Sequence, residues 1–268
     1  MSDGLSPAER QHYIRQTIVP DWGEAGQLQL KAARVLVIGA GGLGAPVLMY
    51  LAATGVGTIG VADGDFVEIS NLHRQVIHMT DDLDVPKVES AARKMRLSNP
   101  HIKVVEHLFP VTRDNVAGLI SQYDLVADCT DNFTTREAVA TACSDARIPL
   151  ISGAAQITDG TVTTFAPYLG AGHPCFKCLY PKALDASVTP SCAQIGVVGP
   201  VLAVIGGLQA MEVVKEIIGF GESLSGRMLV YDALSARLSE IQINKQSECG
   251  CGAATSGGNI DQHVVSHR

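Results

Sequence analysis

A strand, a glycine-rich turn, a helix and a second strand are predicted over residues 34–62, and this unit limits the possible folds more than any other feature of the sequence. Residues 34–38 form a short apolar run rich in β-branched side chains, as is typical of a strand buried in a parallel sheet. The helix is predicted over about 43–53 and the second strand over 58–62. Neighbouring strands joined through a helix run parallel, so we expect a parallel sheet.

The alternation of strands and helices continues to about residue 152 and then changes. The next predicted elements are a helix over 86–98, strands over 103–106 and 124–128, a helix over 132–146 that Asn132 caps, and a strand over 149–152. A threonine-rich run over 161–165 suits antiparallel pairing, and a helix over 197–218 and strands over 228–231 and 238–243 follow. The predicted fold class is therefore α/β: a Rossmann-like, mainly parallel sheet with helices on both faces and an antiparallel C-terminal extension. On the long helix, Gln209, Glu212 and Lys215 are predicted to lie on an exposed face.

Composition narrows the class of protein and its expected partners. The chain has 268 residues, of which 46% are hydrophobic and 18% charged, so it can bury a sizeable core. A net charge of −7, without basic blocks, makes nucleic acid or an anionic membrane a poor partner. The uncharged stretch 35–62 is long enough to span a bilayer, but seven glycines and Pro46 interrupt it, so we expect no membrane segment.

The seven cysteines raise two questions: in which cellular compartment the protein resides, and whether their thiols bind a metal or react. The N-terminal residues are polar and charged and show no secretory signal, so we expect a cytoplasmic protein whose thiols stay reduced. Under those conditions, clustered cysteines more often bind a metal or take part in chemistry than form disulfides. Cys129 and Cys143 are interpreted as small buried hydrophobic residues.

The glycine-rich turn indicates a bound nucleotide. The segment Gly39-Ala-Gly41-Gly42-Leu-Gly44 lies between a predicted strand and a helix and matches G-x-G-x-x-G, and Asp63 follows the next strand. Glycines let the backbone approach phosphates, a helix N-terminus favours negative charge, and a carboxylate at this position can bind ribose hydroxyls. NAD-dependent oxidoreductases share all of these features, so this activity stays open as an alternative function.

A second group of polar residues favours ATP over NAD. Ligands of open parallel sheets sit at the carboxyl ends of the strands, so Asp63 and Asp131 should face one crevice. Arg74 and Lys87 lie on segments that can fold over it. An enzyme that cleaves ATP needs cations on the phosphates and a carboxylate on Mg²⁺, whereas hydride transfer needs little positive charge beside the nicotinamide. The combination favours phosphate chemistry and also argues against a third class, a non-catalytic nucleotide-sensing or metal-bound scaffold.

Taken together, these motifs resemble the MoeB/ThiF family, bacterial relatives of the ubiquitin-activating enzymes. The matching stretches, from about residue 10 to residue 251, are Tyr13-Ile-Arg15-Gln16, Gly39 to Gly44, Gly55-Val-Gly57, Ser70-Asn71-Leu-His-Arg74-Gln75, Pro86-Lys87, Asp128-Cys-Thr-Asp131-Asn132, Cys175-Phe-Lys-Cys178 and Gly196-Val-Val-Gly-Pro200. Members of the family use MgATP to adenylate the C-terminal glycine of a small ubiquitin-fold sulfur-carrier protein, and they release pyrophosphate. The acyl-adenylate is then sulfurated for molybdopterin or thiamin biosynthesis.

The resemblance implies roles for individual residues. Asp131 is expected to coordinate the catalytic Mg²⁺, and Arg15 to reach the triphosphate from the second subunit of a homodimer. The expected ATP contacts are Gly42, Asp63, Asn71, Arg74 and Lys87, together with their motif neighbours Gly39, Gly41, Gly44, Asp65, Gln75, Asp131 and Asn132. Such a site needs no general base, because a terminal carboxylate is already an anionic nucleophile. The enzyme has only to align it with the α-phosphorus and stabilise the departing pyrophosphate, for which Arg74 and Lys87 are the expected catalytic cations.

Four cysteines predict a zinc site. Cys175 and Cys178 form a C-x-x-C pair, which is half of a tetrahedral site. The family usually completes it with a second C-x-x-C, whereas this chain has Cys249 and Cys251 in a C-x-C pair. We expect a structural Zn²⁺, because four protein ligands leave no open position for catalysis. The alternative is a partly filled or absent site.

Cys192 is a candidate catalytic residue outside this cluster. By resemblance, it matches the cysteine that in the ThiF branch forms a covalent link with the C-terminus of the carrier, while its role in the MoeB branch is weaker. It lies in a polar segment that is expected to be flexible, and a lone loop cysteine is usually inert. Both interpretations stay open.

The expected organisation is a single adenylation domain over residues 1–251, followed by a flexible tail over 252–268. Within the domain we expect an N-terminal helical segment over 1–33, a nucleotide-binding core over 34–152 and a part over 153–251 that binds the carrier and zinc. No rhodanese-like region is recognised after residue 251, so the sulfur is expected to come from another protein. Which carrier protein the chain serves stays open.

Overall fold

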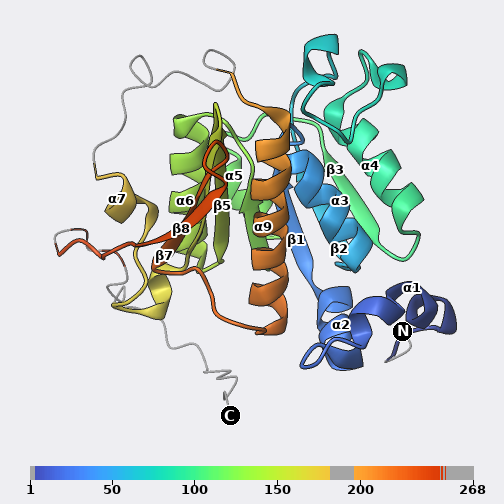
Figure 1. Ribbon diagram of the computed structural model, residues 1–268, viewed down its shortest axis with the longest axis horizontal. Helices are drawn as coiled ribbons and strands as arrows, with labels where there is room; N and C mark the ends of the chain where they lie inside the picture. The colour runs from blue at the N-terminus through green and yellow to red at the C-terminus, as the bar shows by residue number, and fades with distance from the viewer. Residues whose placement is uncertain (1–3, 182–195, 248, 250, 252–268) are drawn as a thin grey trace.

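The strands of the described residues form one eight-stranded sheet. The computed structural model describes residues 4–181, 196–247, 249 and 251. The strands are β1 (Arg34–Ile38), β2 (Thr58–Ala62), β3 (Lys103–His107), β4 (Leu125–Asp128), β5 (Leu150–Gln156), β6 (Asp159–Phe165), β7 (Arg227–Asp232) and β8 (Arg237–Gln242). Their order is β3-β2-β1-β4-β5-β6-β7-β8 (Figure 1). The first five pair in parallel and the rest antiparallel, which confirms the predicted α/β fold with its antiparallel extension.

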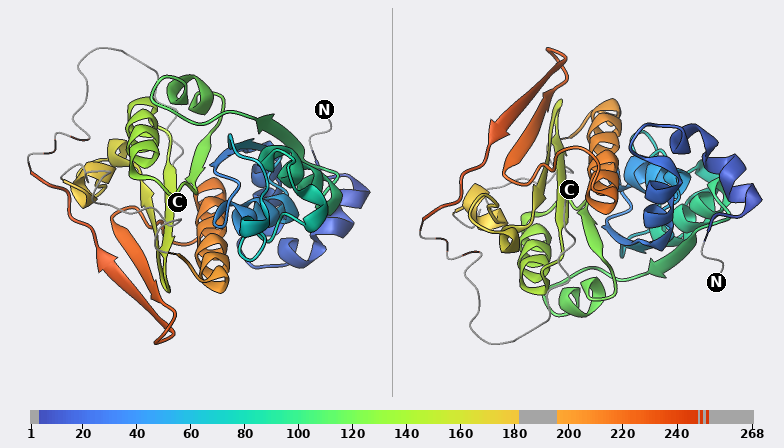
Figure 2. Two further views of the ribbon diagram at one scale, coloured as in Figure 1. Left: turned by 90° about the horizontal axis from the view of Figure 1, so that it is seen from above. Right: turned by 90° about the horizontal axis from the view of Figure 1, so that it is seen from below.

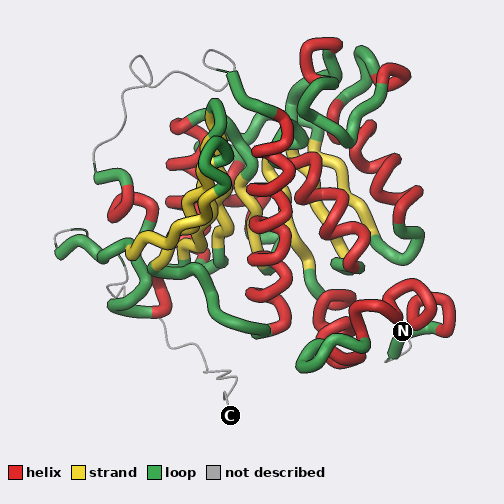
Figure 3. Tube along the Cα trace, in the orientation of Figure 1, coloured by secondary structure: helices red, strands yellow, loops and turns green. Residues whose placement is uncertain are grey.

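Helices cover both faces of this sheet. The described α-helices are α1 (Pro7–Thr17), α2 (Gly23–Ala32), α3 (Gly44–Thr54), α4 (Lys87–Ser98), α5 (Val116–Ile120), α6 (Phe133–Ala146), α7 (Phe176–Leu179) and α9 (Gly199–Ile218). Short 3₁₀ turns are η1 (Ile69–Asn71), η2 (Thr80–Asp82) and η3 (Pro167–Leu169). Helices α3, α4 and α9 pack on one face, and α5 and α6 on the other (Figures 2 and 3).

The side chains of β1 pack alternately into the two hydrophobic cores, one on each face of the sheet. Val35 and Val37 belong to the buried cluster that includes residues of α3, α4 and α9. Leu36 and Ile38 belong to the cluster that includes residues of α5 and α6. Successive side chains of a strand point to opposite faces, so a fully apolar run is needed where both faces are covered.

Strand pairing changes from parallel to antiparallel between β5 and β6, and the pairing with β6 determines the length of β5. The sequence predicts that this strand ends at residue 152, but the strand continues to Gln156. It does so because β6 pairs with it antiparallel over seven positions, from Leu150↔Phe165 to Gln156↔Asp159. Ile157, in the turn, takes a left-handed conformation with φ of 53°.

The prediction that Gln209 and Glu212 lie on an exposed face of α9 is wrong. Gln209 is fully buried and Glu212 is 2% exposed. The Gln209 amide donates to the carbonyl oxygens of Asp128 (2.8 Å) and Ile151 (3.1 Å), so it links α9 to β4 and β5. Glu212 accepts from the Leu224 amide at 2.6 Å and pairs with Lys215. A polar side chain can be buried when it has such partners, and periodicity alone does not reveal them.

Two further expectations agree with the structure. Cys129 and Cys143 are buried, as interpreted from the sequence, and burial raises the pKa of both thiols. The uncharged stretch 35–62 folds as β1, α3 and β2. Among the helices of the described residues, none has both the length and the apolar composition that crossing a bilayer requires.

Candidate functional site

A pocket of about 550 Å³ opens at the carboxyl ends of the parallel strands. Its walls come from the turns after β1, β2 and β4, from the start of α4 and from β5 and β6. Ten of the predicted ATP contacts line it: Gly39, Gly41, Gly42, Asp63, Asp65, Arg74, Gln75, Lys87, Asp131 and Asn132. The structure therefore brings most of the predicted contacts into one cavity.

The glycine-rich turn needs two of its glycines for steric reasons. Gly39 has a φ of +96°, a conformation that side chains disfavour. A Cβ on Gly44 would overlap the carbonyl oxygen of Gly39. Gly44 does not line the pocket, so its contribution is the tight entry into α3. The turn thereby exposes backbone to the pocket at the N-terminus of a helix, a position that favours anions.

Asp63 fastens the end of β2 to this turn. One carboxylate oxygen accepts from the Ala40 amide at 2.8 Å, and the other accepts from the Asp65 amide at 2.8 Å. The carboxylate still faces the pocket and keeps lone pairs available, because each oxygen can accept more than one hydrogen bond.

Two cations lie at one side of the pocket. Lys87, whose side chain is 8% exposed, begins α4 and forms an ion pair with Asp65 at 2.8 Å. Arg74 donates to the carbonyl oxygen of Ser70 at 2.8 Å and lies 2.7 Å from a ring nitrogen of His73. Both positive charges therefore lie close to the glycine-rich turn, where they can act on an anionic ligand.

Asp131 and Asn132 line the pocket from the turn between β4 and α6. Both side chains are exposed. Asn132 caps α6, as predicted, by accepting from the Thr135 amide at 2.9 Å. Asp131 thus lines the pocket with an exposed carboxylate.

Besides Gly44, three residues predicted to act on ATP or the carrier are not among the described residues that line this cavity. Asn71 is buried, and its side-chain oxygen accepts from the Glu68 amide at 3.0 Å, which closes η1. Arg15 is exposed on α1, which lies at the opposite end of the sheet (Figure 1). Cys192 lies outside the described residues.

Arg136 is a pocket residue that the sequence analysis missed. Its guanidinium donates to the carbonyl oxygens of Gly153 (2.7 Å) and Thr130, and it lies 4.0 Å from the buried Asp128 carboxylate. It therefore links the turn after β4 to the middle of β5. Its place one helical turn after Asn132, on the inner face of a helix that starts at the pocket, is the signal that could have identified it.

An aromatic wall, also missed, closes the pocket toward the antiparallel strands. It consists of Phe133, Phe176 and Tyr180, all of which line the cavity. The Phe176 ring lies 5.4 Å from Phe133 and 4.8 Å from Tyr180, measured between ring centroids. Burial raises the pKa of the Tyr180 phenol, so this side chain stays neutral.

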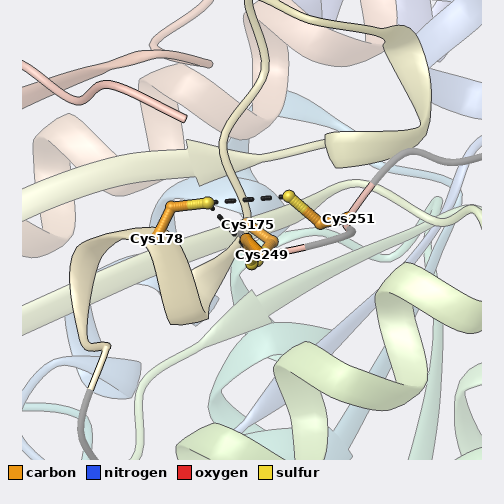
Figure 4. Close-up of side chains that lie close together, drawn as sticks. All are labelled: Cys175, Cys178, Cys249 and Cys251. Carbon is orange, nitrogen blue, oxygen red and sulfur yellow. Dashed lines mark hydrogen bonds between the residues drawn. The ribbon is translucent and has the colours of Figure 1, made fainter. Parts of the chain in front are cut away.

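The four predicted metal ligands lie together beside this wall. Cys175 Sγ is 3.8 Å from Cys178 Sγ and 3.3 Å from Cys249 Sγ, and Cys178 Sγ is 3.5 Å from Cys251 Sγ (Figure 4). All four sulfurs lie within 4.8 Å of one another. A tetrahedral site with Zn–S bonds of about 2.3 Å has sulfurs about 3.8 Å apart. The C-x-C pair is thus compatible with a four-thiolate metal site.

Comparison with known proteins identifies the family. A model of the ThiF family matches residues 13–253. The chain belongs to the ThiF family. This confirms the resemblance to the MoeB/ThiF proteins that the motifs predicted.

Proteins similar to this ThiF-family chain include one from a bacterium and one from a plant, and both names state an activity. The chain is 43% identical to the sulfur carrier protein adenylyltransferase of Thermus thermophilus, covering 91% of each chain. It is 44% identical to the adenylyltransferase and sulfurtransferase MOCS3-2 of Zea mays over 91% of its own length, but spans only 50% of that protein. Neither name indicates an oxidoreductase, so the comparisons do not support the NAD-dependent alternative.

Solved structures share the fold of this ThiF-family chain. The crystal structure of E. coli MccB with MccA-N7isoASN superposes with a TM-score of 0.79 at 22% sequence identity, covering 90% of this chain and 74% of that one. At this identity, the similarity supports the architecture of the sheet and its helices and says nothing about the ligand.

Proposed function

We propose that this protein is an ATP-dependent adenylyltransferase that activates the C-terminal glycine of a small ubiquitin-fold sulfur-carrier protein. One observation supports the proposal: in this ThiF-family chain, the same pocket contains the glycine-rich turn, two cations and the accessible Asp131 carboxylate. These are the groups that nucleotide cleavage at a phosphate requires. The product would be an acyl-adenylate, with release of pyrophosphate.

The proposed nucleotide contacts follow the pocket walls. Backbone groups of Gly39, Gly41 and Gly42 approach the phosphates, and Asp63 accepts from the ribose hydroxyls. Gln75, which is 4% exposed and has a side-chain oxygen without a hydrogen-bond partner among the described residues, offers a further polar contact. Asn71 and Gly44 support this surface from behind, through η1 and the start of α3.

The proposed chemistry uses charge rather than a base. The carrier carboxylate attacks the α-phosphorus, while Lys87 and Arg74 stabilise the pyrophosphate that leaves. Arg74 uses one guanidinium nitrogen for its contacts with Ser70 and His73, and Lys87 forms one ion pair with Asp65, so both cations keep N–H donors for the phosphates. Asp131 would hold Mg²⁺, since an accessible carboxylate suits this cation, and the ion would neutralise charge on the phosphates.

The proposed place for the carrier tail is the side of the pocket toward the antiparallel strands. Gln156, Asp159 and Thr161 line it, and the aromatic wall closes it. We further propose a homodimer in which the partner subunit supplies Arg15, a separate sulfur-donor protein and a cytoplasmic location. Cys192 is proposed as a candidate for the covalent link to the carrier, in which its thiolate would attack the carbonyl carbon of the acyl-adenylate and AMP would leave.

The four-cysteine cluster is proposed to hold a structural Zn²⁺. The sulfur distances support this assignment, as does the purely thiolate ligand set, which suits zinc better than Mg²⁺ or Ca²⁺. With four protein ligands, the ion would serve to link the segment after β8 to α7.

Intact-mass spectrometry tests the proposed reaction. A candidate carrier ending in Gly-Gly is incubated with the protein, ATP and Mg²⁺, and the expected result is a mass gain of one AMP together with released pyrophosphate. A carrier that lacks its last glycine is the matched control and should gain no mass. If several carriers gain nothing, pyrophosphate exchange is absent and the protein nevertheless binds ATP, a scaffold function replaces the proposal.

A further inference from the structure

Ala40, in the middle of the glycine-rich turn, is held by a side chain on each of its polar backbone groups. Its amide donates to Asp63 at 2.8 Å, and its carbonyl oxygen lies 2.9 Å from Nε2 of His78. Ala40 is fully buried and His78 is 3% exposed, so water does not replace either bond. The shape of the turn therefore depends on these two side chains as well as on its glycines.

His78 connects the turn to α4. Its other ring nitrogen, Nδ1, lies 2.8 Å from the Ser90 hydroxyl, on the helix that begins at Lys87. A carbonyl oxygen can only accept, so Nε2 must carry the hydrogen that points to Ala40. In the neutral ring, Nδ1 then accepts from the Ser90 hydroxyl.

The surroundings of His78 favour the neutral ring. Burial lowers the pKa of the imidazole, and the positive charges of Lys87 and Lys94, both on α4, lower it further. The bond to Ala40 and the charge of Asp82, in η2, act in the opposite direction but are smaller effects than burial. The ring is therefore uncharged near pH 7.

We propose that His78 is a positioning residue: its neutral Nε2–H holds the glycine-rich turn in the shape that receives the nucleotide, and it ties that shape to α4. The inference rests on the proposed function and deepens it, because it makes nucleotide binding at this site sensitive to acid. A second proton, on Nδ1, would reverse the hydrogen bond to Ser90, whose hydroxyl can also accept, and it would bury a positive charge near Lys87 and Lys94. The buried charge disfavours this state of the connection between turn and helix.

Two substitutions separate the two ends of the ring. In His78→Gln the amide nitrogen takes the place of Nε2, so the bond to Ala40 is kept and no group titrates. In His78→Asn the amide lies at the place of Nδ1, so only the side toward Ser90 is kept. MgATP affinity is measured by calorimetry for both variants and for the unaltered protein at pH 7.5 and pH 5.5.

The expected affinities differ in a defined order. At pH 7.5, His78→Gln stays within about threefold of the unaltered protein, and His78→Asn is weaker by tenfold or more. As the pH falls from 7.5 to 5.5, the unaltered protein loses affinity more steeply than His78→Gln, which has no ring to protonate. Equal affinities of the two variants would overturn the proposal, and parallel pH profiles of the unaltered protein and His78→Gln would remove the sensitivity to acid.

Hydrogen exchange in the ligand-free proteins provides a readout that needs no nucleotide. At one fixed pH, the amides of residues 39–44 should exchange faster in His78→Asn than in His78→Gln. If the unaltered protein fails to bind MgATP, the proposed function fails. The exchange rates then still decide whether His78 holds the turn, since equal rates in the two variants would refute it.

Discussion

Side chains that bind backbone groups determine the shape of the pocket. Asp63 connects the glycine-rich turn to the segment after β2, and Arg136 connects the turn after β4 to the middle of β5. Each forms bonds across two chain segments, so the pocket walls are fixed before a ligand arrives. Asp131, between β4 and α6, and Asp159, on β6, are exposed carboxylates of this pocket.

At the residue scale, we expect Asp131→Asn to lower the rate of adenylate formation by at least about 100-fold, because the amide binds Mg²⁺ poorly. The exposed side chain contributes little to the fold, so the unfolding midpoint should stay within about 1–2 °C. Pyrophosphate exchange and thermal unfolding measure the two effects. Asp145→Asn, an exposed substitution at the far end of α6, is the control and should leave both unchanged. Near-normal exchange in Asp131→Asn would remove this residue from the proposed site.

The sequence predicted which residues lie at the pocket better than it predicted the hydrogen bonds that those residues form. Glycines and charged residues at strand ends could be recognised, because the ends of parallel strands converge. The sequence could not tell that Asn71 folds back onto Glu68, since a local bond of this kind competes with any ligand. Arg136 was missed because its partners are backbone carbonyl oxygens, one in the turn after β4 and one in β5, and the sequence marks it only by its place one helical turn after Asn132.

At the element scale, α9 packs closely on α3 through one glycine. A Cβ on Gly206 would overlap the ring of Pro46 and lie 3.1 Å from the carbonyl oxygen of Leu43. The adjacent Gly207 has nothing within 4 Å of the corresponding position. Both are in the interior of the same helix, so they differ in contacts and not in helix propensity.

This difference predicts opposite effects of two neighbouring substitutions. Gly206→Ala should lower the free energy of unfolding by about 1–3 kcal/mol through overpacking. Gly207→Ala should raise it by up to about 1 kcal/mol through helix propensity. Denaturant unfolding of both variants measures the effects, and equal destabilisation would contradict the close contact between α9 and α3.

Asp82 joins η2 to α4 and predicts a pH dependence. Burial acts to raise the pKa of its carboxyl, but hydrogen bonds from Lys94 and the Met79 amide outweigh this effect and lower it from 3.8 to about 2. A lowered pKa stabilises the fold above the ordinary value, and that stability is lost as the pH falls from about 4 to 2. The contribution is about 2 kcal/mol at 1.36 kcal/mol per unit.

We expect Asp82→Asn to be less stable than the unaltered protein at pH 5 and to lose less stability between pH 5 and pH 2.5. Urea unfolding across this range measures the slope. Asp81→Asn, at the exposed neighbouring position, should leave the slope unchanged. The prediction fails if Asp82→Asn and the unaltered protein lose stability in parallel.

The sequence predicted the bounds of strands that their own apolar residues determine. It failed where a strand end, or a buried side chain, depends on contacts with a distant segment of the chain. The bounds of β1 and β2 match the prediction, because each is an apolar run that both faces require. The end of β5 depends on β6, and the burial of Gln209 depends on carbonyl groups of β4 and β5. Neither dependence leaves a periodic pattern in the sequence.

At the scale of the whole molecule, the cysteine cluster predicts that stability depends on metal. We expect metal analysis of the purified protein to find one Zn²⁺ per chain, and a strong chelator to lower the unfolding midpoint by roughly 10 °C. Cys175→Ser should show a similarly low midpoint that the chelator does not lower further. An unfolding midpoint that is insensitive to chelation, or protein free of zinc, would contradict the assignment.

The position of the cysteines along the chain has a consequence for the unfolded state. Cys178 and Cys251 are 73 residues apart, and α9, β7 and β8 lie between them. Any ion that joins them closes a ring of that length, and such closure removes about 4 kcal/mol of chain entropy from the denatured ensemble. For as long as the ion stays bound, the cluster would then favour the native state without a single additional contact in the sheet.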